Sequence, residues 1–490
     1  MLIKHKIRIW GLFCLFLSSM CSVSGCKEKQ PVSPTPPVKP AEPTWVKTQV
    51  QFWLTNPDLS TLFKRQNVAL NFSTSSNTNA APVIEVDTAQ TYQTIDGFGY
   101  TLTGGSAIVI NQLNATKKAD LLKELFAVDS TYIGISYLRI SVGASDLSDR
   151  VYTYDDTPAG QTDVNLTNFN LAQDQTQLIP LLKEILKINP SIKILATPWT
   201  APVWMKTNNN FIGGSLKSEY YEVYARYLIK YLQAMQAEGI TIDAITVQNE
   251  PLHDGNNPSM YMPANEQAAF IKNYFGPALQ SSGLKTKIIL YDHNADMPDY
   301  PISILNDPEA KKYVDGSAFH LYGGSISALS TVRNAHPDKN IYFTEQYTAA
   351  SGSFAEDLNW HLKNLIIGAT RNWSRNVLEW NLAADPNNRP YTNGGCTVCL
   401  PAVTVSGSSI SHNVSYYIIA HAAKFVRPGS VRIATNIPVN LQNVAFKRPD
   451  GKKVLIVLND SQTSQTFNIK YRGSMIATTL NGGAVGTYFW

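Results

Sequence analysis

The stretch Ala244-Ile245-Thr246-Val247-Gln248-Asn249-Glu250-Pro251 begins as a short apolar strand and ends in an acid and a proline. The stretch Ile341-Tyr342-Phe343-Thr344-Glu345 has the same form, because an apolar run again finishes in a glutamate. Amphipathic runs of helical length lie elsewhere along the chain, at residues 116–126, 177–188 and 219–238. A chain that alternates short apolar strands with longer helical runs is typical of parallel βα units.

Eight such units can be counted between residues 94 and 424. Their strands are expected to end near Gly99, Ser141, Thr197, Gln248, Tyr291, His320, Glu345 and Trp380. Eight βα repeats over roughly 300 residues predict an α/β fold, the (β/α)8 TIM barrel. Active sites of such barrels lie at the carboxyl ends of the strands, so the residues at these strand ends are the candidates for chemistry.

The segments on either side of the barrel have a different pattern, with short strand-like runs and turn signals. Residues 45–93 contain two such runs, 46–54 and 83–86. Residues 425–490 contain five, at 431–434, 444–447, 453–458, 466–471 and 475–479. Turn signals such as Pro449-Asp450-Gly451 separate some of them. We therefore expect one β-sandwich, built from both ends of the chain, beside the barrel.

Of the 490 residues, 44% are hydrophobic and 16% are charged, which excludes a disordered chain and predicts a large buried core. The formal net charge is +4, and Lys4, Lys6 and Arg8 at the amino end supply most of it. The remainder is nearly neutral, so the charge balance gives no reason to expect nucleic acid as a partner. Aromatic residues make up 10%, a content that suits the packing of flat rings against sugars.

Residues 1–25 have the composition of a secretory signal peptide, with a basic start, an apolar run from Ile9 to Leu17 and then small residues. The apolar run is shorter than the ~20 residues of a membrane-spanning helix. The ending Val23-Ser24-Gly25-Cys26 resembles the lipobox of bacterial lipoproteins, which implies that Cys26 becomes the lipidated first residue. The alternative is an ordinary secretory peptide with a chance cysteine.

Residues 26–44 form a proline-rich linker, which is expected to hold the folded part away from a membrane surface as a semi-rigid spacer. We expect the membrane to be a partner through an N-terminal lipid anchor. The expected location is the bacterial outer membrane at the cell surface, with the periplasm as the alternative. The sequence does not specify an oligomeric state, and a monomer is favoured.

Cys396 and Cys399 are the cysteines in the part of the chain that is expected to fold. In an exported protein a single C-x-x-C pair is expected to close a disulfide loop rather than bind metal, because there is no second pair and no histidine nearby in sequence. Such a disulfide would stiffen a loop over the cleft after the eighth strand. Asp292-His293-Asn294 has no further ligand at metal spacing, so we expect no metal.

Glu250 and Glu345 are the strongest catalytic candidates, because the fourth and seventh strands face each other across a closed eight-stranded barrel. Two glutamates that converge there can flank a glycosidic bond. One protonates the departing oxygen, and the other attacks the anomeric carbon or activates water. Asn249, beside the first acid, can donate to the sugar 2-hydroxyl. Each glutamate alone fits a salt-bridged rim residue, but the pair at these two strand ends favours catalysis.

Seven motifs occur in order within residues 87–490. They are TIDGFG (94–99), LRIS with SDLS (138–148), ATPWTAP (196–202), QNEP (248–251), FHLY (319–322), FTE (343–345) and EWN (379–381). Together they resemble glycoside hydrolase family 30. The resemblance implies a retaining β-glycosidase on a TIM barrel with a side β-sandwich from both chain ends. It also implies Glu250 as the acid/base and Glu345 as the nucleophile. No cofactor is implied, because the chemistry needs two carboxylates and water.

The same motif matches imply which residues surround the scissile bond. Asp146 and Trp199 would hydrogen-bond sugar hydroxyls, Asn249 would bind the 2-hydroxyl, and Trp380 would supply an aromatic floor. Arg139 matches an arginine near the nucleophile, where a cation keeps Glu345 ionised. The alternative for Arg139 is a structural ion pair with another acid.

The sixth strand end supplies two further matches, His320 and Tyr322. The resemblance places Tyr322 within hydrogen-bonding reach of the nucleophile. His320 matches the family at this strand end, and its alternative is a satisfied core histidine.

The resemblance leaves the substrate open, because the family covers glucosylceramide, β-1,6-glucan, β-1,6-galactan, xylan, fucosides and xylosides on similar barrels. Residues 204–208, 211–214 and 379–383 look most like the branch that contains glucosylceramidases and endo-β-1,6-glucanases. We therefore expect a retaining endo-β-1,6-glucanase whose substrate is the polysaccharide of fungal or yeast cell walls. A glucosylceramidase-like or other family 30 β-glycosidase is the alternative. A non-catalytic glycan-binding lipoprotein is a remote one, because both glutamates are intact.

Overall fold

The computed structural model describes residues 45–74, 80–129 and 132–490. The expected signal peptide, Cys26 and the proline-rich linker lie outside the described residues. Within the described ranges no helix is long and apolar enough to cross a membrane.

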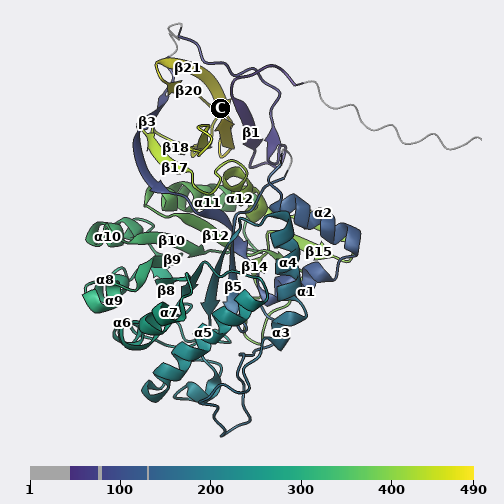
Figure 1. The fold of residues 1–490 in the computed structure, drawn as a ribbon. Coiled ribbons are helices and arrows are strands. Elements are labelled where there is room, and N and C mark those ends of the chain that lie inside the picture. Colours follow the sequence, from purple (N-terminus) through teal and green to yellow (C-terminus); the bar gives the residue numbers. More distant parts are fainter. Residues whose placement is uncertain (1–44, 75–79, 130–131) are drawn as a thin grey trace, which may run out of the picture. The chain divides into compact units, whose positions relative to one another are not determined.

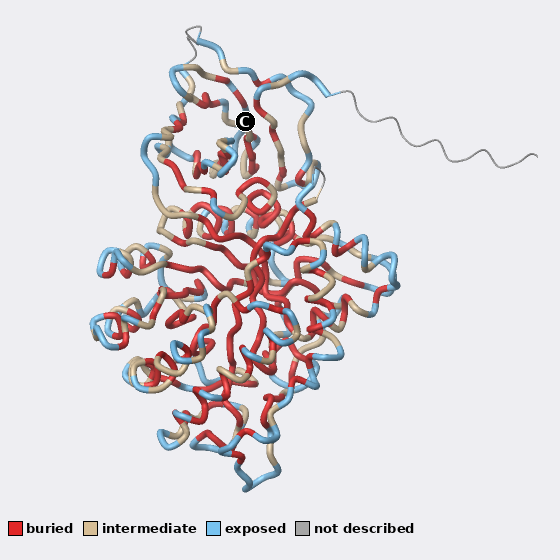
Figure 2. Tube along the Cα trace, viewed as in Figure 1, coloured by how far each residue is buried: buried red, intermediate tan, exposed pale blue. Residues whose placement is uncertain are grey.

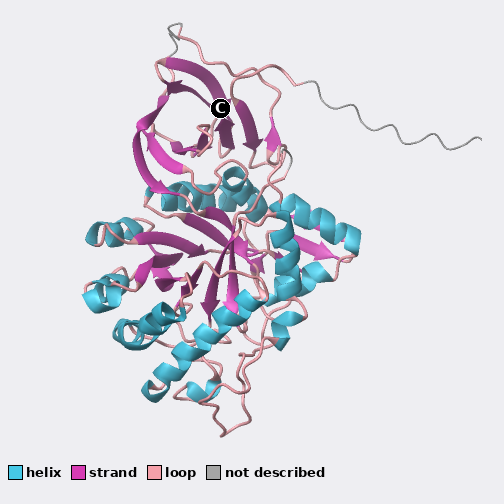
Figure 3. Ribbon diagram, viewed as in Figure 1, coloured by secondary structure: helices cyan, strands magenta, loops and turns pink. Residues whose placement is uncertain are grey.

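Eight parallel strands form a nearly closed barrel in the described part of the chain (Figures 1 and 3). They are β4 (Gly97–Thr101), β5 (Tyr137–Val142), β6 (Lys193–Pro198), β7 (Ala244–Thr246), β8 (Lys287–Ala295), β9 (Val314–Gly324), β10 (Asn340–Glu345) and β12 (Asn376–Asn381). Neighbours in the chain are neighbours in the sheet, and β12 pairs with β4. The gap between β10 and β12 is bridged where the Arg375 N–H donates to the Ile341 carbonyl at 2.9 Å. The predicted TIM barrel is confirmed.

The barrel strands form where the sequence is apolar on both faces, as parallel strands enclosed by helices require. Every residue of β5 and β12 is buried. The centre of the barrel is filled by an apolar cluster of Tyr137, Leu195, Ala244, Ile289, Ala318, Tyr342 and Leu378. Most of these residues lie in the amino-terminal halves of their strands, so the carboxyl ends remain available for polar side chains.

Helices cover the outside of the barrel (Figure 3). They are α1 (Gly104–Asn111), α2 (Ala115–Phe126), α3 (Ala172–Gln175), α4 (Leu178–Ile188), α5 (Tyr221–Ala237), α6 (Ala264–Phe270), α7 (Gly276–Ser282), α8 (Asp299–Leu305), α9 (Pro308–Lys311), α10 (Ala328–Ala335), α11 (Phe354–His361) and α12 (Val414–Ala423). Short 3-10 turns are η1 (Val203–Met205) and η2 (Ser218–Tyr220), and π-helical segments are η3 (Ile271–Phe275) and η4 (Leu362–Ala369). The three predicted helical runs correspond to α2, α4 and α5. The side chain of Asn114 caps α2 by accepting from the Lys117 N–H at 2.9 Å.

A nine-stranded sheet in the described residues forms the second lobe, and its strands curve around a common centre (Figure 3). Its members are β1 (Gln51–Thr55), β2 (Lys64–Arg65), β3 (Val83–Thr94), β17 (Val431–Thr435), β18 (Leu441–Lys447), β19 (Lys453–Asn459), β20 (Gln465–Tyr471), β21 (Ser474–Leu480) and β22 (Val485–Phe489). β1 pairs with β22, and β3 lies between β17 and β20, so both ends of the chain build this lobe as predicted.

Several strands of this lobe differ from the sequence prediction. β1 begins at Gln51 rather than at residue 46, and β3 continues to Thr94 rather than ending at residue 86. β22 was not predicted, although it lies inside the sheet between β1 and β19, and neither was the edge strand β2. The second half of β3 is mostly polar and contains no buried residue, so it carries no apolar pattern. In β22, Gly486 interrupts the apolar pattern because Phe52 packs where a Cβ would lie.

The two lobes meet at α12, where buried residues form a continuous band (Figure 2). His421 on α12 bonds through Nε2 to the Thr55 hydroxyl of β1 and through Nδ1 to the Thr487 hydroxyl of β22, both at 2.8 Å. Burial lowers the pKa of His421 to about 3, so this histidine is neutral. At α12 the sandwich is therefore attached to the barrel by uncharged, buried contacts, while at η4 Lys363 pairs with Asp460 of the sandwich at 2.7 Å.

Short strands above the barrel rim were not predicted either. β11 (Thr348–Ala349) pairs with β14 (Cys399–Leu400), and β13 (Ala383–Ala384) pairs with β15 (Val403–Ser406), which pairs with β16 (Ser409–His412). These strands have only two to four residues each, which is too few to show the alternation of apolar and polar residues that predicts a strand. They fold the segment between β12 and α12 back over the carboxyl end of the barrel.

Candidate active site

Glu250 and Glu345 meet at the carboxyl end of the barrel. Glu345 is the last residue of β10, and Glu250 follows β7 in a turn where its φ is +43°. The Glu250 N–H donates to the Asp292 carbonyl at 2.9 Å, which holds this left-handed conformation in place. Both glutamates are buried. The structure thus brings together the two acids that lie 95 positions apart in sequence.

His320, on β9, connects the two glutamates. Its Nδ1 lies 3.0 Å from Glu250 Oε1 and 4.0 Å from Glu345 Oε1, and its Nε2 lies 3.0 Å from Asp292 Oδ1. Burial acts to lower the pKa of His320, but the charge of Glu345 and the contacts with Asp292 and Glu250 raise it to about 9. His320 therefore holds a proton among three carboxylates and is not a simple core residue.

Arg139, on β5, lies fully buried beside Glu345. Its Nη1 donates to Glu345 Oε2, and its Nη2 donates to Asn249 Oδ1 at 2.7 Å and to Asp292 Oδ2 at 3.0 Å. Tyr322 donates its hydroxyl to Glu345 Oε1 at 3.0 Å, so each oxygen of this carboxylate has its own donor. The expected contacts of Arg139 and Tyr322 with Glu345 are both present.

Burial and charge move the pKa values of the two glutamates in opposite directions. Burial acts to raise the pKa of Glu250, but the hydrogen bond and charge of His320 bring it below its usual value. Burial raises the pKa of Glu345 and the nearby Glu250 adds to this, so Glu345 stays above its usual value although His320 and Arg139 act to lower it. Arg139 therefore acts in the expected direction on Glu345, but burial outweighs it.

Asp292 was missed as a site residue, although it lies at the centre of the network. It accepts from Arg139, from the Thr246 hydroxyl at 2.8 Å and from the Thr344 hydroxyl at 2.6 Å, and it pairs with His320. Burial acts to raise the pKa of Asp292, but Arg139 and His320 hold it far below its usual range. The sequence signal was its place directly after the fifth predicted strand, where it was considered only as a metal ligand.

Trp199 and Trp380 stack on each other beside Arg139. Their ring centroids lie 5.6 Å apart at 28°, and the guanidinium lies 4.7 Å from the Trp199 ring. The stack places Trp380, the expected aromatic floor, against Trp199, and the cation over the Trp199 ring fixes the position of both.

Asp146, which follows β5, is buried beside the two glutamates. One carboxyl oxygen accepts from the Cys396 N–H at 3.3 Å. Burial, and then the charge of Glu345, raise the pKa of Asp146 to about 7. Asp146 can therefore present either a hydrogen-bond donor or an acceptor to a ligand near neutral pH.

Cys396 and Cys399 are joined by a disulfide in the loop that follows β13. Cys399 packs in one cluster with Leu147, Trp199 and Trp380, so the loop lies directly against the aromatic stack.

The described residues contain one group that could hold a metal ion. One ligand atom each of Glu250, His320 and Glu345 lie within 4.8 Å of one another. Asp292 and His293 do not form the cluster that their adjacency suggests, because Asp292 faces Arg139 while His293 Nδ1 lies 4.0 Å from Glu250. The expectation that the enzyme needs no metal stays a prediction.

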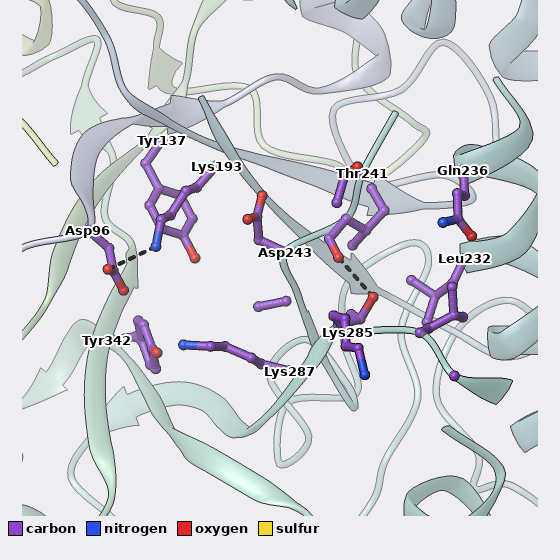
Figure 4. Close-up of a pocket in the computed structure, with 15 residues that line it drawn as sticks. Asp96, Tyr137, Lys193, Leu232, Gln236, Thr241, Asp243, Lys285, Lys287 and Tyr342 are labelled. Atoms are coloured by element: carbon purple, nitrogen blue, oxygen red, sulfur yellow. Dashed lines mark hydrogen bonds and ion pairs between the residues drawn. The ribbon is translucent and has the colours of Figure 1, made fainter. Parts of the chain in front are cut away.

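A separate cavity of about 270 Å³ lies at the opposite, amino-terminal end of the barrel (Figure 4). The first residues of several barrel strands line it, and Lys193 reaches across to Asp96 at 3.0 Å. Asp96 also accepts from Arg375. This cavity contains none of the predicted site residues, and the charge of Asp96 there is matched by cations.

The family follows from comparison with known domains. The family model of the glycosyl hydrolase family 30 TIM-barrel domain matches residues 95–426, and that of the family 30 β-sandwich domain matches residues 429–488. The chain belongs to glycosyl hydrolase family 30. It is a glycoside hydrolase, as its motifs predicted.

Individual relatives of this family 30 chain fall into two groups. It is 36% identical to endo-1,6-beta-D-glucanase neg1 of Aspergillus fumigatus over 394 residues, which cover 75% of this chain and 78% of the fungal protein. It is 29% identical to lysosomal acid glucosylceramidase of Mus musculus over 459 residues, which cover 87% of each. Among solved structures, the endo-beta1,6-glucanase BT3312 superposes with a TM-score of 0.84 at 35% identity, over 91% of this chain and 99% of BT3312.

Proposed function

We propose that this family 30 hydrolase is a retaining endo-β-1,6-glucanase. The observation that carries the mechanism is that an oxygen of Glu250 and an oxygen of Glu345 lie within 4.8 Å of each other. Retaining glycosidases hold their carboxyl groups roughly 5–5.5 Å apart, whereas inverting enzymes leave roughly 6.5–9.5 Å for a water molecule. The short separation supports double displacement through a covalent glycosyl-enzyme.

In the first step Glu345 is the nucleophile and Glu250 the acid. A Glu345 oxygen forms a bond to the anomeric carbon while the bond to the glycosidic oxygen breaks, and Glu250 gives that oxygen a proton. Arg139 and Tyr322 each hold one oxygen of Glu345, which fixes the plane of the attacking carboxylate. The raised pKa of Glu345 implies that the acid side of the activity profile lies above the ordinary glutamate value.

The proton that Glu250 delivers is held in its hydrogen bond with His320. In the free enzyme the histidine side of this bond has the higher pKa, about 9, because three carboxylates surround it. When a glycosidic oxygen enters next to Glu250, the proton passes through Glu250 to the leaving group. In the second step Glu250 removes a proton from water, which attacks the anomeric carbon and releases Glu345.

Four further side chains contribute to sugar binding in this proposal. Asn249 has its amide oxygen occupied by Arg139, so its NH2 group is oriented for the 2-hydroxyl. Asp146 binds another sugar hydroxyl. Trp199 binds a further hydroxyl and Trp380 supplies the apolar surface under the ring, and their stacking beside Arg139 keeps both side chains fixed.

The choice of β-1,6-glucan rests on the fungal and BT3312 glucanases, which are 36% and 35% identical to this chain. The mouse glucosylceramidase favours glucosylceramide as the second candidate substrate. The deciding experiment incubates the full chain separately with linear β-1,6-glucan and with glucosylceramide. A ladder of short β-1,6-linked oligosaccharides, released first as the β-anomer in NMR, is expected. Activity on the lipid alone would overturn the glucanase assignment.

We also propose that the enzyme is tethered to the bacterial outer membrane through Cys26. Support comes from the sequence, in which Val23-Ser24-Gly25-Cys26 precedes a proline-rich segment. The test is metabolic labelling with a fatty acid in a bacterial host that processes lipoproteins. Label is expected on the wild type and lost in Cys26→Ala. Protease treatment of whole cells then distinguishes the surface, which we propose, from the periplasm.

A further inference from the structure

The loop between β13 and β14 contacts Asp146 at three points. The Cys396 N–H donates to Asp146 Oδ2 at 3.3 Å, and the Thr392 N–H donates to the Asp146 carbonyl at 2.8 Å. The Thr392 hydroxyl also lies 3.2 Å from that carbonyl and donates to the Asn257 carbonyl. The side chain and the backbone of Asp146 are therefore both held by this one loop.

The approach of this loop to Asp146 is close enough to require glycine at position 395. A Cβ on Gly395 would lie 2.3 Å from the Asp146 carbonyl and 2.9 Å from the Thr392 hydroxyl. Backbone atoms cannot yield to such a contact without moving the loop. The adjacent Asn393, by contrast, is exposed.

The far end of the same loop is fixed to the nucleophile strand. Cys399 belongs to β14, which pairs with β11, and β11 begins three residues after Glu345. The Trp380 N–H donates to the Gln346 carbonyl at 2.8 Å, which connects this segment to the aromatic stack. The disulfide joins the residue that contacts Asp146 to the residue on β14, so it shortens the path between the two attachments.

We propose that the loop 392–399, closed by the Cys396–Cys399 disulfide, is a positioning element that sets Asp146 against the sugar relative to Glu345. Thr392, Gly395 and Cys396 are its positioning residues, and they act through Asp146 rather than on the substrate. The proposal rests on the proposed function, because it assumes that Asp146 binds the sugar whose anomeric carbon Glu345 attacks.

The test is a double-mutant cycle on the full chain, with kcat, KM and pH profile measured on linear β-1,6-glucan. Gly395→Ala and the pair Cys396→Ser with Cys399→Ser are each made in the wild-type and in the Asp146→Asn background. We expect each loop change to lower kcat by roughly 10- to 100-fold in the wild type, because small misplacements at a reacting centre have effects of this size. In the Asp146→Asn background the further loss should be less than about threefold, because the group being positioned is already impaired.

Two controls separate positioning from loss of folding. Asn393→Ala changes an exposed side chain in the same loop and should stay within about twofold of the wild type. Thr392→Val should lower kcat while Thr392→Ser restores it, with the same melting temperature in both, and this comparison remains usable if the cysteine variant does not fold. Equal losses in both Asp146 backgrounds, or full activity of Gly395→Ala, would contradict the proposal.

The wild type also separates this proposal from the proposed function. A wild type that is inactive on linear β-1,6-glucan contradicts the substrate assignment. An active wild type whose variant losses are additive contradicts the positioning role alone.

Discussion

At the amino end of the barrel Asp96 accepts from Arg375 at 2.9 and 3.0 Å and from Lys193 at 3.0 Å, so two cations serve one acid. At the carboxyl end Glu250, Glu345 and Asp292 share Arg139 and His320. Asp146 lies beside them with no cation partner among the described residues. One fold thus carries a saturated charge cluster at one end and a cluster with excess acid at the other.

The cluster around Asp96 is suited to stabilising the fold, whereas the cluster at the carboxyl end is suited to catalysis. The pKa of Asp96 is lowered, because its cation partners outweigh the effect of burial, and its proton plays no part in reactions. At the carboxyl end burial acts to raise the pKa of every acid. Arg139 and His320 reverse this at Asp292, whereas the pKa of Glu345 stays raised and that of Asp146 is raised to about 7. Divergent pKa values in one cleft are what acid and base catalysis requires.

The largest effect is expected from Glu345→Gln, which removes the proposed nucleophile and keeps its shape. Turnover of β-1,6-glucan should fall about 10⁴-fold or more, while binding of the glucan and the melting temperature change little. Steady-state kinetics and glucan binding by calorimetry check this. Retention of even a tenth of the activity would contradict the assignment of Glu345.

Glu250→Gln is expected to have a smaller and substrate-dependent effect. Loss on β-1,6-glucan should be roughly 10²- to 10⁴-fold, because the leaving alkoxide needs a proton. A β-glucoside of an acidic phenol leaves without protonation, so glycosyl-enzyme formation from it, measured as a burst, should fall less than about tenfold. Equal losses on both substrates would argue that Glu250 is not the acid.

Asp292→Asn tests whether the shared anion organises the carboxyl end. Activity should fall roughly 10²-fold, because Arg139 and His320 lose a common anchor. Removal of this charge also lowers the pKa of His320 from its value of about 9, so the alkaline limb of the activity profile should move to lower pH. Thr344→Val is the matched control, since it removes one donor to Asp292 and leaves the charge. An unmoved alkaline limb would contradict the proton-holding role of His320.

Asp96→Asn, at the amino end of the barrel, should lower stability and leave activity nearly unchanged. We expect a loss of about 2–3 kcal/mol in the free energy of unfolding, less than for a fully buried pair because Lys193 is one-third exposed. Because the pKa of Asp96 is lowered on folding, its contribution is present above pH 3.8 and is lost as the pH falls through the folded value. Chemical denaturation at pH 7 measures the loss, and kcat at 25 °C should stay within about twofold of the wild type. A large fall in kcat would contradict the claim that the amino end of the barrel serves stability alone.

The fold was predictable where buried elements produce a regular pattern of apolar residues in the sequence. The barrel strands are enclosed on both faces and appear as apolar runs, so their carboxyl ends could be placed within a few residues. The second half of β3 is polar, and the rim strands have two to four residues each. Neither therefore shows the regular apolar pattern by which a strand is recognised. Those elements are specified by pairing across long sequence separations, which a single sequence does not display.

The site was predictable to the extent that strand ends point into one cleft. Glu250 and Glu345 were named because each follows or ends a predicted strand, and Arg139 and His320 were named because they match family 30 motifs near predicted strand ends. The importance of Asp292 comes from contacts with Arg139, 153 positions away, and with Thr344, 52 positions away. Likewise, the contacts between Asp146 and Cys396 span 250 positions, and no local pattern indicates them.

The smallest effect should come from two acids outside both clusters, Asp155 and Asp163. Both residues lie in the segment between β5 and α3. Asp155 is almost fully buried, and neither of its carboxyl oxygens has a hydrogen-bond partner among the described residues. Burial, and then the charge of Asp163, raise the pKa of Asp155 to about 7. The folded state thus binds this proton more tightly than the unfolded state does, so stability falls as the pH rises toward about 7.

Asp155→Asn keeps the size of the side chain and removes its proton dependence. Its melting temperature should match the wild type near pH 4 and exceed it by a few degrees at pH 8, where the wild type must bury two charges side by side. Asp149→Asn, at an exposed position in the same segment, is the control for the loss of one carboxylate. A pH-independent difference for Asp155→Asn would show that this pair is neutralised in another way. The excess of acid would then have a pKa consequence only at the carboxyl end of the barrel.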